Sequence, residues 1–168
     1  MGKPPPRASS DNVRLRDVRH EDLAAFYQHQ LDKDANVMAA FTAKDPEDRG
    51  AFMSHWEHLL GDAAITKQTI LVNEQVAGHV ASFARDGDPE VTYWLGREYW
   101  GMGVATRALA EFLEQIETRP LFASVAQDNL PSIRVLIKCG FALIGEDTAF
   151  SNARNEEVAE FILRLDGV

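Results

Sequence analysis

A strongly amphipathic helix between two short apolar strands most constrains how this chain can fold. From Ala105 to Ile116, apolar residues recur at the three- and four-residue spacing of a helix with one buried face. The segments 90–95 before it and 121–126 after it are rich in residues that favour strands. A strand, a crossover helix and a second strand of this length imply a parallel pair inside a sheet.

Further strands and helices are predicted on both sides of that unit. Alternating or apolar segments predict strands over 13–18, 68–72, 75–85, 141–145 and 158–165. Helical spacing and capping residues predict helices over 20–32, from Asp45-Pro46-Glu47 to about Gly61, and over 129–139. The tight connection at 73–74 makes its two flanking strands an antiparallel hairpin. The sequence therefore predicts an α/β (α+β) fold with a mixed sheet.

Length and charge limit the class of protein further. The 168 residues fit one domain, expected over 12–168, after a Pro- and Ser-rich tail, 1–11, expected to be disordered. Asp and Glu number 26 against 17 Lys and Arg, a net charge of −9, which argues against nucleic acid as a partner. No apolar run is long enough for a membrane span or a signal peptide, so we expect a cytoplasmic protein. The single cysteine, Cys139, excludes an internal disulfide.

A loop with two glycines, Gly101 and Gly103, separates the strand 90–95 from the amphipathic helix. Glycine lets the main chain approach a ligand closely, and a helix start has unpaired N–H groups that attract anions. The loop therefore suits a diphosphate. It lacks the third glycine of a dinucleotide fingerprint, because Thr106 stands there, and it lacks the Lys of a P-loop. Taken alone, the loop fits a tight turn without a ligand equally well.

Two blocks of sequence resemble the GCN5-related N-acetyltransferase (GNAT) superfamily, closest to its Rim-like branch. The first block is Tyr93-Trp94-Leu95 with Glu98-Tyr99-Trp100-Gly101-x-Gly103-x-Ala105-Thr106, and the second runs from Asn129 and Ser132 to Gly140-Phe141. The similarity extends over about 13–165. Glu98 departs from the Gln or Arg that the superfamily often has there, although Glu is common in the Rim-like branch. The resemblance implies the GNAT fold: a mostly antiparallel sheet, a splayed parallel pair in its middle, and helices on both faces.

The resemblance also implies acetyl-CoA as the cofactor and indicates which residues bind it. The main chain of 93–95 would pair with the pantetheine arm, and the helix start would bind the diphosphate, with Arg97 adding positive charge. Asn129 and Ser132 would lie beside the thioester. The implied cofactor-binding residues are Tyr93, Trp94, Leu95, Arg97, Trp100, Gly101, Met102, Gly103, Val104, Ala105, Thr106, Asn129 and Ser132.

Three residues are candidates for catalysis: Ser132, Glu90 and Asn129. Many GNAT enzymes protonate the thiolate with a tyrosine, but Leu136 stands at that position, so the resemblance moves the role to Ser132. A first-turn serine that only caps the helix is the alternative. Glu90 resembles a position where relatives place an acid beside the amine, and a solvated carboxylate at a strand end is its alternative. A site with a weak base favours α-amines, which are about one-third neutral near pH 7.5.

Three functions stay open at this stage. The favoured one transfers an acetyl group to a primary amine, on a protein N-terminus or a small molecule, by direct attack in a ternary complex. The others are a non-catalytic acyl-CoA sensor and a domain that only binds a partner. The regions 32–61 and 147–157 would build the acceptor pocket. No metal site is expected, because His55 and His58 lack further ligands, and the protein is expected to be a monomer or a homodimer.

Overall fold

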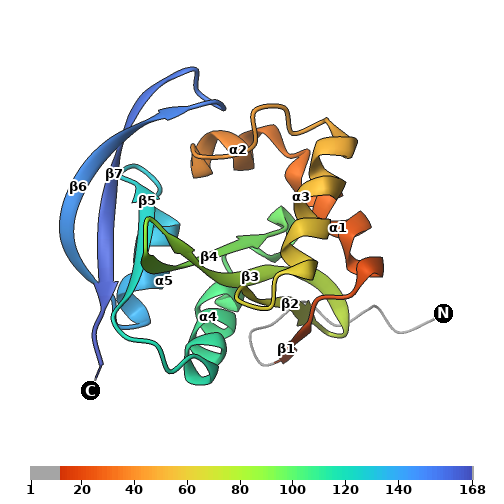
Figure 1. Cartoon of the computed structure of the whole chain (residues 1–168), viewed down its shortest axis with the longest axis horizontal. Helices are drawn as coiled ribbons and strands as arrows, with labels where there is room; N and C mark the ends of the chain where they lie inside the picture. Colours follow the sequence, from red (N-terminus) through yellow and green to blue (C-terminus); the bar gives the residue numbers. More distant parts are fainter. Residues whose placement is uncertain (1–11, 168) are drawn as a thin grey trace.

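Helices cover both faces of a seven-stranded sheet in the computed structural model, which describes residues 12–167 (Figure 1). The sheet order is β1-β2-β3-β4-β5-β7-β6, in which β4 and β5 run parallel and the other neighbours run antiparallel. The strands are β1 (Val13–Asp17), β2 (Thr66–Val72), β3 (Gln75–Arg85), β4 (Asp88–Leu95), β5 (Leu121–Ala126), β6 (Ala142–Ser151) and β7 (Glu156–Leu165). The tail predicted over 1–11 lies outside the described residues.

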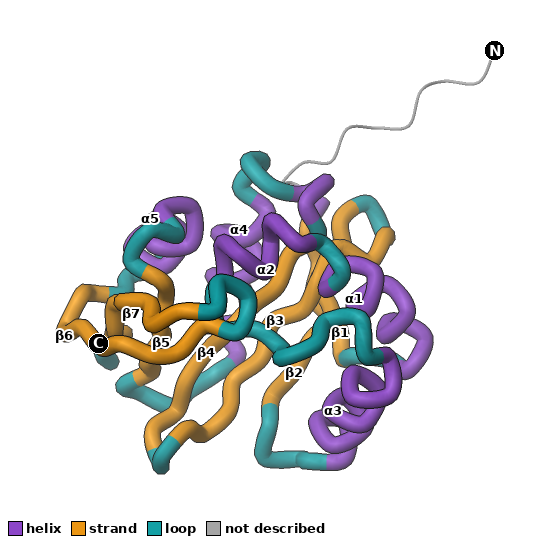
Figure 2. The backbone as a smooth tube through the Cα atoms, turned by 90° about the horizontal axis from the view of Figure 1, so that it is seen from above, coloured by secondary structure: helices purple, strands orange, loops and turns teal. Residues whose placement is uncertain are grey.

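Each face of the sheet has its own set of helices. α1 (Leu23–Gln30), α2 (Lys33–Ala39) and α3 (Arg49–Gly61) lie on one face, and α4 (Val104–Gln115) and α5 (Leu130–Lys138) lie on the other (Figure 1). Seen from above, α1 and α3 lie side by side near β1–β3, whereas α5 lies near β5–β7 (Figure 2). The mixed sheet with helices on both faces confirms the predicted fold.

The larger core lies between the sheet and α4. The apolar stripe of this helix buries Ala108, Leu109, Phe112 and Leu113 against strand residues such as Ile70. Burial of each large apolar side chain contributes about 1.5–3 kcal/mol, so this stripe fixes the helix on the sheet. The position of α4 in turn sets where its N-terminus meets the end of β4.

A smaller core packs α1 and α3 onto the opposite face. It contains Leu23, Phe26, Phe52 and Trp56. The ring of His79 on β3 lies 4.8 Å from that of Phe26 and 4.9 Å from that of Trp56, centroid to centroid. Burial lowers the pKa of His79 to about 3, so the imidazole is neutral at physiological pH. His79 is therefore a packing residue, and a poor base.

The parallel strands separate after a single paired position. β4 and β5 are joined only at Glu90 and Phe122, and beyond this point the two strands diverge toward Leu95 and Ala126. The predicted splayed pair is thus confirmed. Its V-shaped gap opens in the middle of the sheet, with helices above and below it.

Three predicted element boundaries were wrong. The segment 20–32 is not one helix: α1 ends at Gln30, and Asp32 accepts the N–H groups of Asp34 and Ala35 to begin α2, which the sequence analysis missed. Asp48, not Asp45, caps α3. β6 continues to Ser151, so most of the segment 147–157 belongs to a β-hairpin with β7.

Candidate active site

A cavity of about 610 Å³ lies beside the end of β4, on the side where β4 and β5 have separated. It reaches both faces of the sheet, because α4 and α5 contribute residues on one side and α2 contributes residues on the other. Residues of β4 line the cavity between these two sets of helices. The lining residues include Ala35, Met38, Ala39, Tyr93, Trp94, Leu95, Tyr99, Trp100, Gly101, Gly103, Val104, Ala105, Thr106, Asn129, Pro131, Ser132, Arg134, Val135 and Lys138.

The glycine loop forms one end of this cavity. Gly101 and Gly103 have φ values of +74° and +75°, a conformation that residues with a Cβ rarely adopt. Gly103 is the N-cap of α4, and no side chain caps this helix start. The first N–H groups of α4 therefore have no intrahelical acceptor and carry the partial positive charge of the helix end. This geometry fits a phosphate or diphosphate group.

The edge of β4 that faces the gap is available for hydrogen bonding. The Gly96 N–H donates to Ala77 O on β3, so alternate residues toward the start of β4 also pair with β3. Tyr93 and Leu95 consequently direct their main-chain groups toward β5, from which β4 has separated. The Trp100 Nε1–H donates to Leu95 O at 2.8 Å and ties the loop to this strand. An extended ligand in the gap can pair with the remaining groups like an added strand.

The hydroxyl groups of Tyr93 and Ser132 meet at the wall of the cavity. The Tyr93 hydroxyl donates to Ser132 Oγ at 3.1 Å. Burial raises the pKa of Tyr93, so the phenol stays protonated and remains a donor. Asn129 caps α5 by accepting the Ser132 N–H at 3.4 Å, which places Ser132 in the first turn. Ser132 was predicted at the site from the sequence, whereas no role was predicted for the Tyr93 side chain.

The positively charged residues that line the cavity do not include Arg97, which the sequence predicted near the phosphates. The Arg97 guanidinium binds Asp32 and, at 3.0 Å, Asp34, and it does not line the cavity. Arg134 and Lys138 of α5 do line it, on the side of the glycine loop. Their spacing of four residues on one helix face was a signal that the sequence analysis did not use. Met102 packs against the larger core and does not line the cavity either.

Glu90 lies at the closed end of the gap, where β4 and β5 are still paired. Its carboxylate accepts a hydrogen bond from Ser124 Oγ at 3.5 Å and lies 3.6 Å from Arg85 Nε. Burial raises the pKa of Glu90, and Arg85 opposes this effect only in part. Glu90 does not line the cavity, but its side chain lies on the same face of the sheet as the cavity wall from α2.

That face is open above β4. Thr92, between Glu90 and Trp94 on this face, is exposed although β4 is a central strand. α1 packs against β3, whereas α2 lies nearer β5 (Figure 1), and Thr92 between them is exposed to solvent. A second reactant can therefore approach from the side opposite to the glycine loop.

Two further findings concern other classes of site. Among residues 12–167, no cluster of three or more His, Cys, Asp or Glu side chains is arranged to hold a metal ion. In the same part of the chain, no helix has the length and apolar character needed to cross a membrane.

The comparisons with known proteins agree with this geometry. The sequence profile described as acetyltransferase (GNAT) domain matches residues 12–142. RimJ from Mycobacterium smegmatis in complex with CoA-disulfide is similar with a TM-score of 0.80 and 21% identity, over 96% of this chain and 85% of that one. The microcin C7 self-immunity acetyltransferase MccE, in complex with acetyl-CoA and AMP, gives 0.79 and 17%, over 94% and 93%. A search of curated proteins found no sequence that matches this chain.

A third similar structure is spermidine N-acetyltransferase from Vibrio cholerae in complex with CoA and spermine. Its TM-score is 0.75 at 17% identity, over 92% of this chain and 96% of that one. The fold and the matching sequence profile thus define an acetyltransferase domain of the GNAT type. The chain belongs to the GNAT acetyltransferase domain family, as its sequence predicted. The predicted cosubstrate, acetyl-CoA, agrees with the ligands of these solved structures.

Proposed function

We propose that this protein transfers an acetyl group from acetyl-CoA to a primary amine by direct attack in a ternary complex. The observation that carries the proposal is the cavity that crosses the sheet between β4 and β5. An uncapped helix start lies at one of its ends, and an open face of the sheet lies at the other. Two reactants can thus occupy one continuous space and meet inside it.

The glycine side of the cavity suits coenzyme A. N–H groups of the α4 start, Val104 to Thr106, would bind the diphosphate, and Arg134 and Lys138 would neutralise phosphate charge. Tyr93 and Leu95 would pair with the amide groups of the pantetheine arm along β4. Bound acetyl-CoA supplies the activated acyl group. A Leu95 N–H that faces the gap can stabilise negative charge on the carbonyl oxygen.

Proton transfer is assigned to groups on opposite sides of the gap. Across the reaction one proton leaves the amine nitrogen and one arrives at the sulfur, as the C–N bond forms and the C–S bond breaks. Glu90 would take the first proton, directly or through a water molecule. The Ser132 hydroxyl would deliver the second, and the hydrogen bond from Tyr93 leaves the Ser132 proton free to be donated. Solvent restores both groups.

The acceptor amine belongs to a protein N-terminus or to a small molecule. RimJ and the spermidine acetyltransferase share the fold, which makes a protein or a small amine a reasonable acceptor. An acyl-CoA sensor without catalysis is the second candidate, and it is favoured by the absence of Glu90 from the residues that line the cavity. The two candidates differ in one measurable property, the release of free CoA thiol that depends on an added amine.

The decisive experiment combines binding and turnover. We expect calorimetry to detect acetyl-CoA binding in the micromolar range, and a thiol assay to detect CoA release with members of a panel of peptides, polyamines, amino acids and aminoglycosides. Binding without amine-dependent release would leave the sensor as the function. Absence of binding would show that the cavity serves another ligand.

A further inference from the structure

Glu160 on β7 is a largely buried residue whose carboxylate has no partner in the described part of the chain. Only 7% of the residue is accessible to solvent, and among residues 12–167 no hydrogen bond or ion pair to its carboxylate is formed, so its oxygens meet only the remaining solvent. A mostly desolvated carboxylate is costly unless water or a ligand completes its hydrogen bonds. Glu160 is therefore a candidate for contact with a ligand.

The register of the sheet places Glu160 on the acceptor face. Glu160 pairs with Ala126 of β5 and with Asp147 of β6. Side chains two residues apart on a strand share a face, and Val158, two residues away, packs with Ala40 at the end of α2. Glu160 thus lies on the α2 side of the sheet, beside the part of β5 that borders the open gap.

Glu90 lies on this same face, at the closed end of the gap. Its neighbour Ser124 is two residues before Ala126 on β5, a separation of roughly 7 Å along the strand. The two carboxylates therefore lie at two points along one wall of the acceptor path, and their like charges raise the pKa of Glu160 in addition to its burial.

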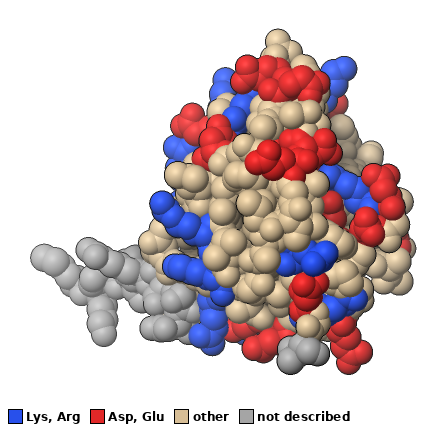
Figure 3. Space-filling view, turned by 90° about the vertical axis from the view of Figure 1, so that its left-hand side faces the viewer, with Lys and Arg blue, Asp and Glu red and all other residues tan. Residues whose placement is uncertain are grey.

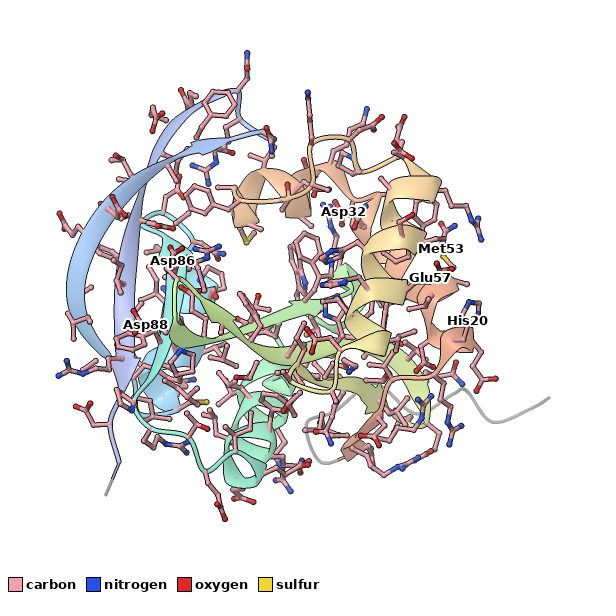
Figure 4. All side chains as sticks on the ribbon, viewed as in Figure 1. His20, Asp32, Met53, Glu57, Asp86 and Asp88 are labelled. Atoms are coloured by element: carbon pink, nitrogen blue, oxygen red, sulfur yellow. The ribbon has the colours of Figure 1, made fainter. Side chains whose placement is uncertain are left out.

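Charge around the pair is mostly negative. Asp147 of β6 approaches Glu160, while Arg85 of β3 is the one cation that acts on both glutamates and is itself paired with Glu90. Asp86 in the turn before β4 and Asp88, the first residue of β4, add negative charge near Glu90, and Figure 4 labels both beside β5. One guanidinium cannot neutralise this set, so the wall attracts cations.

We propose that Glu160 binds a cationic group of the acceptor. The preferred acceptor is then a molecule that carries a second positive charge near its reacting amine. This assignment rests on the proposed acetyl transfer. Glu90 faces the amine that reacts, and Glu160 holds the other cationic group further along β5. A diamine, or a peptide whose second residue is lysine, has this chemistry, and a monoamine lacks it.

The test compares Glu160→Gln with Glu157→Gln. Both variants remove one negative charge from β7, but Glu157 is exposed and its side chain lies on the opposite face of the sheet. Each acceptor is used with a counterpart that lacks only its second positive charge: 1,4-diaminobutane with 1-butylamine, and a tripeptide amide with lysine at its second position with the norleucine peptide. The two pairs distinguish a small amine from a peptide.

We expect wild type and Glu157→Gln to prefer the dicationic member of one pair by at least tenfold in kcat/KM. Glu160→Gln should lose about tenfold of that preference through KM, with the KM for acetyl-CoA unchanged. Equal preference in Glu160→Gln and Glu157→Gln would overturn the assignment. Calorimetry of 1,4-diaminobutane and of the lysine peptide with the CoA-saturated protein gives the same comparison without turnover, so failure of acetyl transfer itself would be distinguishable.

Thermal stability separates a ligand-binding role from a structural one. If Glu160 serves a ligand, its charge destabilises the free protein, and Glu160→Gln should melt at the same temperature as wild type or higher at pH 7.5. A lower melting temperature combined with unchanged amine binding would show that Glu160 only supports the fold.

Discussion

At the scale of single residues, the contact between Tyr93 and Ser132 links the strand that borders the gap to the helix that follows it. We expect Tyr93→Phe to lower kcat about fivefold, since a hydrogen bond of this kind contributes about 1 kcal/mol, and to leave the KM for acetyl-CoA within twofold. Steady-state kinetics measure both quantities. Tyr27→Phe, which removes an exposed hydroxyl bound to Glu47 O, is the matched control and should change neither.

Glu90 yields a prediction about pH. Because burial raises the pKa of its carboxyl group, the proton-accepting form is lost as the pH falls through that raised value. We expect kcat/KM of the wild type to decline on the acidic side, and Glu90→Gln to lower kcat/KM at least tenfold and to remove this limb. A variant with an unchanged rate and profile would show that Glu90 is not the base.

Individual site residues differ in how far the sequence predicted them. The residues of the glycine loop and α5 start were predicted because they are close in sequence and their types reflect one ligand. Arg134 and the α2 residues were not, because only helix packing brings them to the cavity. Arg97 was predicted at the phosphates from proximity alone, and Asp32 and Asp34 hold it elsewhere.

At the scale of elements, the turn before α4 requires glycine at position 101 for two reasons that can be tested apart: its backbone conformation and its contact with the cavity. Gly101 and Gly87 both have positive φ and open space where a Cβ would stand, so alanine at either position costs about 1–2 kcal/mol of strain. Only Gly101 lines the cavity. We expect both variants to lose similar thermal stability, while Gly101→Ala alone weakens acetyl-CoA binding in calorimetry about tenfold. Equal affinity in the two variants would contradict the placement of the diphosphate.

The β6–β7 hairpin is anchored to the rest of the molecule by Arg154. Its guanidinium binds both oxygens of Asp128, at 2.7 and 2.8 Å, and donates to Val37 O of α2. We expect Arg154→Ala to lower the free energy of unfolding by about 2 kcal/mol in urea titrations. Arg154→Lys should recover only part of this, because lysine lacks the planar fork.

The Arg154 ion pair also has a defined pH dependence. Arg154 lowers the pKa of Asp128 below its usual value, so its contribution is present at neutral pH and is lost as the pH falls through the lowered value. The difference in stability between wild type and Arg154→Ala should accordingly shrink in acid.

Elements with strong periodicity were predicted well, and short or exposed ones were not. The helical spacing of apolar residues in α4 and the apolar run of β5 predicted these two elements. α2 has only seven residues and begins with charged ones, so its signal merged with α1. β6 is an edge strand with mostly exposed side chains, and it lacks the alternation that marks a half-buried strand.

At the scale of the whole molecule, the net charge of −9 acts on the approach of a cationic acceptor. Acidic side chains gather toward the upper part of the surface formed by β6 and β7, although basic ones are interspersed (Figure 3). We expect kcat/KM for 1,4-diaminobutane to fall about threefold or more between roughly 0.05 and 0.5 M NaCl, and that for 1-butylamine to fall less. The same salt response for both amines would argue against electrostatic steering.

The cavity beside β4 is lined by residues from both faces of the sheet, and this has a consequence for inhibition. A single compound that joins the acceptor to coenzyme A through the acetyl carbon would have to thread the sheet, with α5 around one half and α2 around the other. Either half alone contacts the helices on one face of the sheet, whereas the joined compound contacts the helices on both faces at once. Such a compound should raise the melting temperature by more than its two halves added together to the same solution.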